Sequence, residues 1–426
     1  MTLLSFGRAH KLASIITDEL WKAGTPASAI LPVGSLRRYA AEAQEVSLLA
    51  VTSIDRINNL LTLSCDLPSV DHILHRTEQS ITAQTKLGTI SIHAINEEAE
   101  GSALISLTGS SKHLDLLSEF AKGQNLLFAN GSLLDSAGKQ FFFRTETSFY
   151  ERLGLIFIPP ELREGKDEIQ AARTNSLPEL LSYKQIRGDL HMHTTWSDGR
   201  NSIKEMVQAS EALGYDYIAI TDHSQSAGSN KKVALSDIPR QKDEIRAVAA
   251  RHPNIQILHG IEVEILSEGS LDFEDQVLAS FDIVLASLHN DEGQSPEVLT
   301  ERYLRAIDSP YVDIITHPAN RSPGLSNGYT LDFNRIFTAA ATTGTALEID
   351  GAPSHLDLDG QLARRATEAK VMIVVDSDCH RSDALRQQMQ FGVVTARRGW
   401  LEPQHVLNTQ RIEDIRRFVK KQRQRA

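Results

Sequence analysis

Residues 188–199 read GDLHMHTTWSDG, and this stretch decides how the C-terminal half of the chain folds. His191 and His193 alternate with the apolar Leu190 and Met192, which is the pattern of a β-strand. Side chains two residues apart on a strand point to the same face, so the two imidazoles can reach one site. A lone HxH pattern is weak evidence for such a site, so the segments that follow must supply the rest of it.

Further apolar runs follow at intervals, and amphipathic segments of helical length separate them. In residues 202–214, SIKEMVQASEALG, the apolar side chains of Ile203, Met206, Val207 and Leu213 recur at helical spacing. Alternating strands and helices are typical of βα units around a parallel sheet or barrel. The seven strand candidates are DLHMH from Asp189, YIAITDH from Tyr217, IQILHGIEV from Ile255, DIVLASLH from Asp282, VDIITH from Val312, TALEID from Thr345 and VMIVVDSD from Val371.

Six of the seven strand candidates end in, or lead within a few residues to, a side chain that can bind a metal ion. The C-terminal ends of barrel strands meet around one pocket, so these side chains should converge. Because thiolates are absent, the set favours several borderline divalent ions, namely Zn, Mn or Fe. The nine candidate ligands are His191, His193, Asp198, His223, Glu262, His289, His317, Asp378 and His380.

A cluster of divalent ions is a common arrangement for hydrolysing phosphate esters. Such ions acidify a bound water and stabilise the phosphoryl and leaving oxygens. Glu262 is the natural bridge, because a carboxylate has two oxygens to share between ions. A serine or cysteine nucleophile is then not needed.

The length of 426 residues and the hydrophobic content of 41% allow two domains with separate cores. Paired prolines, charges and a later Leu-Pro interrupt residues 150–185, which we expect to be a linker. Residues 1–149 mix helical and strand-like pieces and should form an α+β domain. Residues 186–426 would then hold the metal-binding domain.

Charge and cysteine content exclude several classes of protein. The net charge of -11 argues against a surface built as a whole to bind nucleic acid, so any contact with DNA must be local. Cys65 and Cys379 lie far apart, which indicates neither a disulfide framework nor a cysteine metal site. No apolar run approaches the length of a membrane span. We therefore expect a cytoplasmic protein with no membrane partner; the pattern does not specify an oligomeric state.

The motifs of the C-terminal half resemble those of the PHP (polymerase and histidinol phosphatase) superfamily. They are GDLHMHTTWSDG, YIAITDHS, GIEVEIL, ASLH, ITHP and DSDCH. The resemblance implies a distorted (βα)7 barrel with three divalent metal ions. By analogy, one ion would bind His191, His193, Glu262 and Asp378, a second Glu262, His289 and His317, and the third Asp198, His223 and His380.

The upstream sequence resembles bacterial family X DNA polymerases. The upstream segment FYERLGLIFIPPELREG and the late segment RRGWLEPQHVLNT carry this likeness, ILPVGSLRR resembles the nucleotidyltransferase motif, and LTGSSKHLDLL resembles a later palm motif. It implies that residues 1–149 form a domain like the palm of DNA polymerase beta. However, Glu45 and Ser47 stand where the family has two aspartates, and Ser91 stands at the third carboxylate position. Because nucleotidyl transfer needs a carboxylate trio for two magnesium ions, we expect a degenerate domain that does not polymerise.

The metal-binding half also departs from the family. The loop HPANRSPGLSNGY retains Arg321 and Tyr329 but lacks a second arginine, and His355 stands where a later arginine is expected. Arg321 and His355 are either surface residues or substrate contacts. Fewer fixed positive charges weaken the hold on a nucleic-acid backbone.

The leading hypothesis is a phosphodiesterase or exonuclease acting on DNA 3′ ends or related nucleotides. We assign catalytic roles to Glu262, His193, Asp378 and Arg321, and substrate contacts to Arg321 and His355. The alternative is a phosphatase of a small phosphomonoester, like histidinol phosphatase. A third, non-enzymatic hypothesis makes the N-terminal domain a binding or assembly module.

Overall fold

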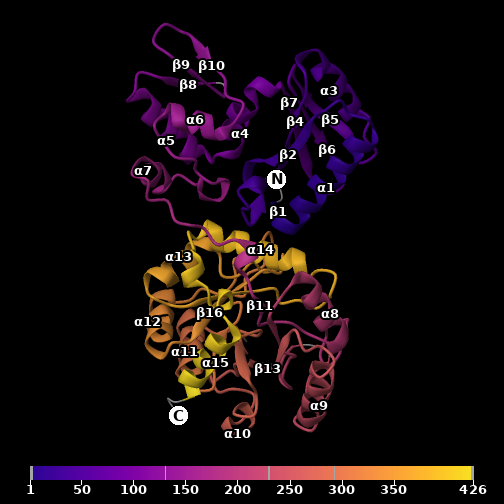
Figure 1. The fold of residues 1–426 in the computed structure, drawn as a ribbon, viewed down its shortest axis with the longest axis vertical. Coiled ribbons are helices and arrows are strands. Elements are labelled where there is room, and N and C mark those ends of the chain that lie inside the picture. The colour runs from indigo at the N-terminus through magenta and orange to yellow at the C-terminus, as the bar shows by residue number, and fades with distance from the viewer. Residues whose placement is uncertain (1–2, 130, 229–230, 292, 424–426) are drawn as a thin grey trace. The chain divides into compact units, whose positions relative to one another are not determined.

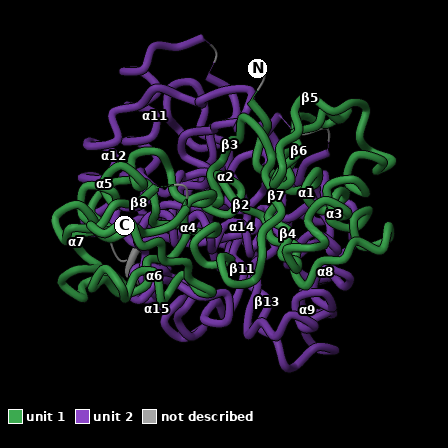
Figure 2. Tube along the Cα trace, turned by 90° about the horizontal axis from the view of Figure 1, so that it is seen from above, with its two compact units in different colours: residues 1–178 green, residues 179–426 purple. Residues whose placement is uncertain are grey.

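The computed structural model describes residues 3–129, 131–228, 231–291 and 293–423. The chain divides into two compact units, Met1–Pro178 and Glu179–Ala426 (Figure 2). The division falls inside residues 150–185, the segment that the sequence suggests as a linker. Much of that segment packs within unit 1, because Glu168 places its buried carboxylate 2.8 Å from Nδ1 of His113.

Unit 2 contains seven parallel strands in sequential order, and helices surround them (Figure 1). This confirms the α/β fold and a strand at each of the seven predicted places, although DLHMH overlaps its strand only at Asp189. The strands are β11 (Gly188–Asp189), β12 (Tyr217–Ile220), β13 (Gln256–Glu264), β14 (Ile283–Ser287), β15 (Ile314–Ile315), β16 (Ala346–Asp350) and β17 (Ile373–Asp376).

The helices of unit 2 follow the strands in alternation. Helix α8 starts at a capping box of Ser202 and Glu205 and ends at Gly214, whose left-handed φ of 80° suits glycine. The α-helices are α8 (Ile203–Leu213), α9 (Ile238–Ala249), α10 (Asp275–Leu278), α11 (Pro296–Asp308), α12 (Phe333–Thr343), α13 (Gly360–Glu368), α14 (Leu385–Arg398) and α15 (Ile412–Arg423). Short 3₁₀ turns are η4 (Tyr183–Gln185), η5 (Pro403–His405) and η6 (Leu407–Thr409).

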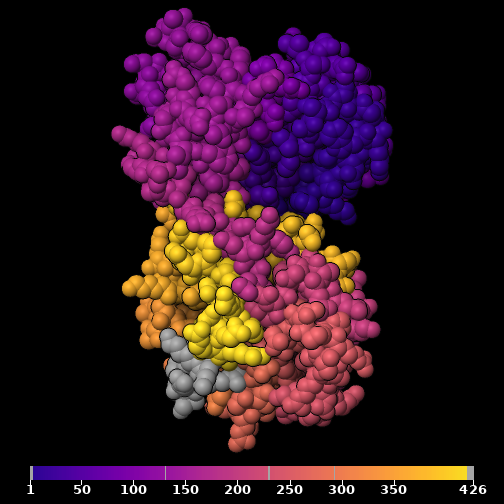
Figure 3. Space-filling model, viewed as in Figure 1, coloured from indigo at the N-terminus to yellow at the C-terminus, as the bar shows by residue number. Residues whose placement is uncertain are grey.

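Side chains of the barrel strands alternate between two cores. On β12, Tyr217 and Ala219 join the inner cluster, whereas Ile218 and Ile220 join the outer cluster with the helices. Ile415 and Val419 of α15 belong to the inner cluster. The last helix therefore contributes to the barrel core, although Figure 3 shows other residues of the C-terminal region (yellow) at the surface of unit 2.

Buried aspartates join the first and last strands of the barrel. Asp376 Oδ1 accepts a hydrogen bond from the Leu190 N–H at 2.7 Å, and Asp189 Oδ1 accepts one from the Ser377 N–H at 3.2 Å. One step further on, the backbone N–H of His193 donates to the carbonyl of Cys379 at 3.0 Å. The segments that follow β11 and β17 are thereby held side by side.

Unit 1 is built on a five-stranded sheet in the order β2-β4-β7-β6-β5. Strand β4 pairs with β7 in parallel, and Ser47 lies opposite Ser91 in this pair. The sheet strands are β2 (Ala29–Val33), β4 (Val46–Val51), β5 (His72–Arg76), β6 (Ser80–Gln84) and β7 (Thr89–Ile95). Two smaller sheets comprise β1 (Leu4–Ser5) with β3 (Glu42–Ala43), and β8 (Leu127–Ala129), β9 (Ser132–Leu134) and β10 (Gln140–Phe141).

Helices complete unit 1, and a buried ion network fastens the later ones to the sheet region. Glu146 accepts two hydrogen bonds from Arg37, at 2.7 and 2.6 Å, and one from the fully buried Arg163 at 2.6 Å. The helices are α1 (Phe6–Lys22), α2 (Gly34–Arg37), α3 (Ile57–Cys65), α4 (Glu100–Thr108), α5 (Ser111–Lys122), α6 (Glu146–Arg152) and α7 (Glu168–Arg173). The 3₁₀ turns are η1 (Ile54–Arg56), η2 (Glu97–Ala99) and η3 (Pro160–Leu162).

Two expectations about chain class can be compared with the structure. Among the described residues, no helix is both long and apolar enough to cross a membrane. Cys65 and Cys379 are both free thiols, as their separation in the sequence suggests.

Candidate metal centre

All nine candidate ligands of unit 2 lie at the C-terminal ends of strands, and the structure brings them together. Glu262 is the one that lies within a strand, β13; the others lie in the segments that follow their strands. In three groups of these residues, one ligand atom from each member lies within 4.8 Å of the others. The groups are His193, Asp198, His223 and His380; His191, His193 and Asp378; and His223, Glu262 and His289.

Glu262 lies at the centre of the cluster. Its carboxylate is buried, and its two oxygens face different sets of imidazoles. Oε2 lies 2.8 Å from His223 Nδ1, 3.4 Å from His191 Nε2 and 3.5 Å from His193 Nε2, whereas Oε1 lies 3.1 Å from His317 Nε2 and 3.6 Å from His289 Nε2. One carboxylate is thus within reach of five possible ligands, as a bridge between two cations requires.

The seam between β11 and β17 supplies a second group. His191 Nε2 and His193 Nε2 are 3.1 Å apart, and Asp378 Oδ1 lies 3.0 Å from His193 Nε2. Met192 and Cys379 form a parallel bridge, so the HxH segment is extended as the sequence suggests. The i, i+2 spacing of Asp378 and His380 also predicts two side chains on one face of a strand. Asp378 instead has a φ of 47°, so strand alternation does not explain how this pair reaches the site.

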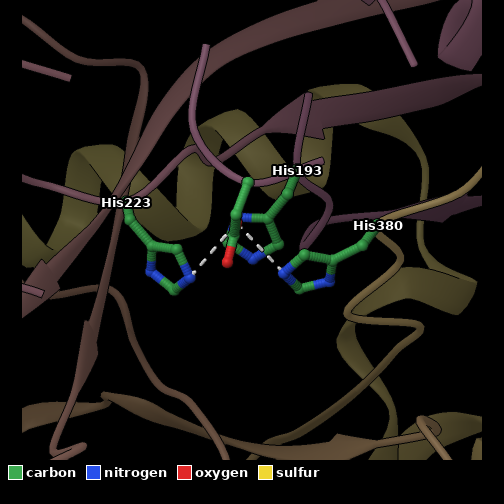
Figure 4. Close-up of side chains that lie close together, drawn as sticks. His193, His223 and His380 are labelled. Carbon is green, nitrogen blue, oxygen red and sulfur yellow. Dashed lines mark ion pairs between the residues drawn. The ribbon is translucent and has the colours of Figure 1, made fainter. Parts of the chain in front are cut away.

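Asp198 brings the third group together. Its Oδ1 atom lies 3.7 Å from His223 Nε2 and 3.3 Å from His380 Nε2, and these ion pairs are the dashed lines in Figure 4. The ring of His193 stacks on that of His380, with centroids 4.2 Å apart. The side chains of Asp198 and His380 are each 35% exposed, so this group lies at the open end of the site.

The donor atoms fit divalent cations better than they fit one another. Glu262 Oε2 and His223 Nδ1 are close, yet both are buried atoms without a hydrogen-bond partner, and so is His317 Nδ1. Buried polar atoms left unpaired are costly, and coordination to a cation would remove that cost. Imidazole nitrogens and carboxylate oxygens without thiolates suit Zn, Mn or Fe.

Some candidate ligands already have the protonation state that binding a cation requires, and His380 does not. Burial opposes ionisation of Glu262, but His223 and His191 outweigh it and hold its pKa well below the usual range. Burial, with His380 and His223 nearby, lowers the pKa of His193 to about 3, so this imidazole is neutral. Burial would lower the pKa of His380, but Asp378 and Asp198 raise it to about 9. A proton must therefore leave His380 when a cation binds there.

Two buried carboxylates that sequence reasoning missed orient the ligands. Glu348 Oε1 lies 2.7 Å from His191 Nδ1, and its Oε2 accepts the backbone N–H of His317 at 2.8 Å. Glu264 Oε2 lies 2.6 Å from Nδ1 of His289. With Nδ1 engaged in this way, Nε2 of His191 and of His289 is left to face the cluster. Glu264 could have been found from its i+2 spacing to Glu262, and Glu348 from its place inside TALEID.

A third missed residue, Asp222, shapes the loop that carries Asp198. Its carboxylate accepts hydrogen bonds from the Thr194 N–H at 2.7 Å, the Ser197 N–H at 3.1 Å and the Gln241 amide at 2.8 Å. Asp222 is buried and immediately precedes His223 in the sequence. The loop after β11 is thereby fixed beside the end of β12.

The two residues suggested as substrate contacts, Arg321 and His355, have different surroundings in the structure. The His355 ring lies beside a ligand, with its centroid 5.5 Å from that of His317. The Arg321 guanidinium instead contacts the His355 carbonyl at 3.2 Å and Asp359 Oδ2 at 3.3 Å. Arg321 thus anchors the segment that carries His355, and its direct contact with substrate stays a prediction.

We predict that Glu264→Gln weakens metal binding roughly 10- to 100-fold, because glutamine cannot hold the His289 Nδ1 proton as the carboxylate does. Isothermal titration of the metal-free protein with Mn²⁺ measures this. Glu211→Gln is the matched control, since Glu211 Oε2 on α8 lies 2.7 Å from Nδ1 of His252, which follows α9. Equal affinity of both variants would contradict the orienting role of Glu264.

Comparison with known proteins agrees with this geometry. The PHP domain family matches residues 189–316, and the DNA polymerase beta thumb family matches residues 103–164. The DNA polymerase/3'-5' exonuclease PolX of Bacillus subtilis (strain 168) is 35% identical over 392 residues, which cover 91% of this chain and 68% of that protein. A probable phosphatase of Thermoanaerobacter sp. (strain X514) is 29% identical over 250 residues, covering 56% of this chain and 96% of the relative. The chain belongs to the PHP superfamily of phosphoesterases and, within it, to the PolX type of bacterial family X proteins.

Proposed function

We propose that this protein hydrolyses phosphate diesters at DNA 3′ ends in the cytoplasm, using three divalent ions held by the nine ligands of unit 2. The observation that carries the proposal is the position of Glu262, whose carboxylate lies within 3.6 Å of ligand nitrogens from five histidines. A carboxylate with only a structural role, paired with one basic side chain, would not need five histidines around it.

Each part of the cluster has a role in this proposal. The first ion would be held by His191, His193, Glu262 and Asp378, the second by Glu262, His289 and His317, and the third by Asp198, His223 and His380. When bound, such ions supply Lewis acidity toward water and toward the phosphoryl oxygens. Because Glu262 is shared, the first two ions would lie at a short, fixed separation.

The protein side chains would position the reacting groups. The buried His191, His193 and Glu262 form the closed end of the site, where displaced water cannot return easily. Asp198 and His380 at the exposed end would meet the substrate first. Glu264 and Glu348 keep the imidazoles of His289 and His191 turned toward the reaction.

Cationic side chains on the ligand-bearing loops favour a substrate with several phosphates. Exposed Arg200 follows the Asp198 loop, and its backbone N–H donates to the carbonyl of His380 at 2.8 Å. Arg381 directly follows His380 and pairs with Asp383, its Nε atom lying 3.0 Å from Oδ1, and Lys231 contacts the Thr195 carbonyl. A nucleic-acid backbone extending past the metal ions could contact these groups.

A phosphatase acting on a small phosphomonoester is the alternative. The net charge of -11 and the engagement of Arg321 within the chain favour it, as does the likeness to proteins named probable phosphatases. The PolX relative, named as a 3'-5' exonuclease, covers far more of this chain and favours the first proposal.

We further propose that unit 1 does not polymerise nucleotides. Ser91 Oγ lies 3.4 Å from Glu45 Oε2 and 3.0 Å from Thr82 Oγ1, and Ser47 is its neighbour across the strand pair. One carboxylate and two hydroxyls stand where magnesium would need three carboxylates. Unit 1 would then serve as a binding or assembly module.

The substrate proposal predicts that the manganese-loaded protein shortens 5′-labelled single-stranded DNA from its 3′ end. Its kcat/KM for p-nitrophenyl phosphate and histidinol phosphate should be at least about tenfold lower, a difference of about 1.4 kcal/mol in transition-state stabilisation. Gel analysis and phosphate release measure the two reactions. Preference for the small esters would favour the alternative function.

In the same assays, Glu262→Gln should lose roughly 10³-fold or more in turnover, about 4 kcal/mol, because an amide cannot bridge two cations. Glu268→Gln, a change at an exposed residue of the following loop, is the matched control. Near-wild-type turnover of Glu262→Gln with full metal occupancy and an unchanged Tm would refute the bridging role.

The account of unit 1 predicts no template-directed primer extension. The test uses the Glu262→Gln protein, so that hydrolysis does not remove extended product, with Mg²⁺ or Mn²⁺ and all four deoxynucleotides. Extension that persists after a further Glu45→Ala change would show that the carboxylate positions are assigned wrongly.

A further inference from the structure

A fourth group of metal-ligand side chains lies beside the nine residues already described. Asp350 ends β16, His355 follows it, and Asp378 follows β17; one ligand atom from each lies within 4.8 Å of the others. Only Asp378 belongs to the nine. Asp350 and Asp378 are buried, and His355 is partly buried.

Two atoms of this group are buried without a partner. Asp350 Oδ1 accepts the Ala352 N–H at 2.6 Å, but its Oδ2 atom has no hydrogen-bond partner, and neither has His355 Nδ1. The Asp350 side chain is completely buried, so water does not solvate the second oxygen. Leaving such atoms unpaired is costly, and a bound ligand would remove the cost.

The negative charge around Asp350 favours a cation as the bound ligand. Glu348, Asp357 and Asp378 are buried carboxylates from the same part of the barrel. Within the part of the chain that the structure describes, no lysine or arginine forms an ion pair with Asp350. The guanidinium of Arg321 is directed at Asp359. One imidazole and two carboxylates are a donor set that divalent Mn, Zn or Fe accepts.

We propose that Asp350, His355 and Asp378 hold a fourth divalent cation next to the three of the catalytic cluster. This inference rests on the proposed function, because Asp378 would bind both the first ion and the fourth. The fourth ion would place positive charge beside His317, on the side of the site where Arg321 is occupied within the chain. There it would bind an oxygen of the substrate phosphate or of the adjoining phosphate.

The test is a count of manganese ions bound per chain. The metal-free full-length protein is titrated with Mn²⁺ alone, and the count is obtained by native mass spectrometry and by elemental analysis after equilibrium dialysis. We expect four ions in the wild type, three in His355→Ala, and four in His252→Ala, a control histidine that pairs with Glu211 away from the site. Asp350→Asn, which can still accept the Ala352 N–H, should also bind three.

The other outcomes each overturn the inference. Three ions in the wild type and in both variants would leave the three-ion proposal standing and remove the fourth site, and four ions in all three proteins would mean that Asp350 and His355 do not hold the fourth ion. A loss of two or more ions in His355→Ala, with unchanged far-ultraviolet circular dichroism, would mean that His355 acts through the catalytic cluster instead. A wild type that binds less than one ion would refute the proposed function and the fourth site together.

Discussion

Two buried aspartates, Asp189 and Asp376, join the first and last strands of the barrel, and the geometry of the candidate metal centre depends on that closure. Their carboxylates accept backbone N–H groups across the seam. Burial raises the pKa of Asp189 to about 6, so closing the barrel with carboxylates opposes their ionisation. Because these hydrogen bonds join the two strands, the segment with His191 and His193 lies against the segment with Asp378 and His380. Four of the nine ligands come from this one seam.

Buried carboxylates also surround the candidate ligands and hold them in place. Glu264 and Glu348 lie behind His289 and His191, and Asp222 holds the Asp198 loop. Burying so many ionisable groups is unfavourable unless they are paired, and divalent cations would balance the ligand carboxylates. His317 and Asp378 have positive φ values of 29° and 47°, a conformation that costs roughly 1–3 kcal/mol per residue and is retained mainly at functional sites.

The sequence predicted the seven strands and the convergence of the ligands because both follow from local periodicity. Parallel strands carry their functional groups at one end, so a histidine, aspartate or glutamate at or after six of the seven apolar runs, taken together, indicates one site. Glu264, Glu348 and Asp222 were missed because their role depends on which side chain from a distant segment faces them. For the same reason, the sequence could not reveal that Arg321 contacts Asp359 and the His355 carbonyl. The left-handed backbone conformation of Asp378 also could not be predicted from the alternation of apolar and polar residues.

The central claim is that nine side chains of unit 2 hold a cluster of divalent ions bridged by Glu262. A crystal of the manganese-loaded protein, measured on both sides of the manganese absorption edge, tests it most directly. The account predicts strong anomalous peaks on both sides of the Glu262 carboxylate, each within about 2.0–2.3 Å of its oxygen and imidazole ligands. Anomalous density confined to one side of Glu262, or absent from these nine residues, would contradict it.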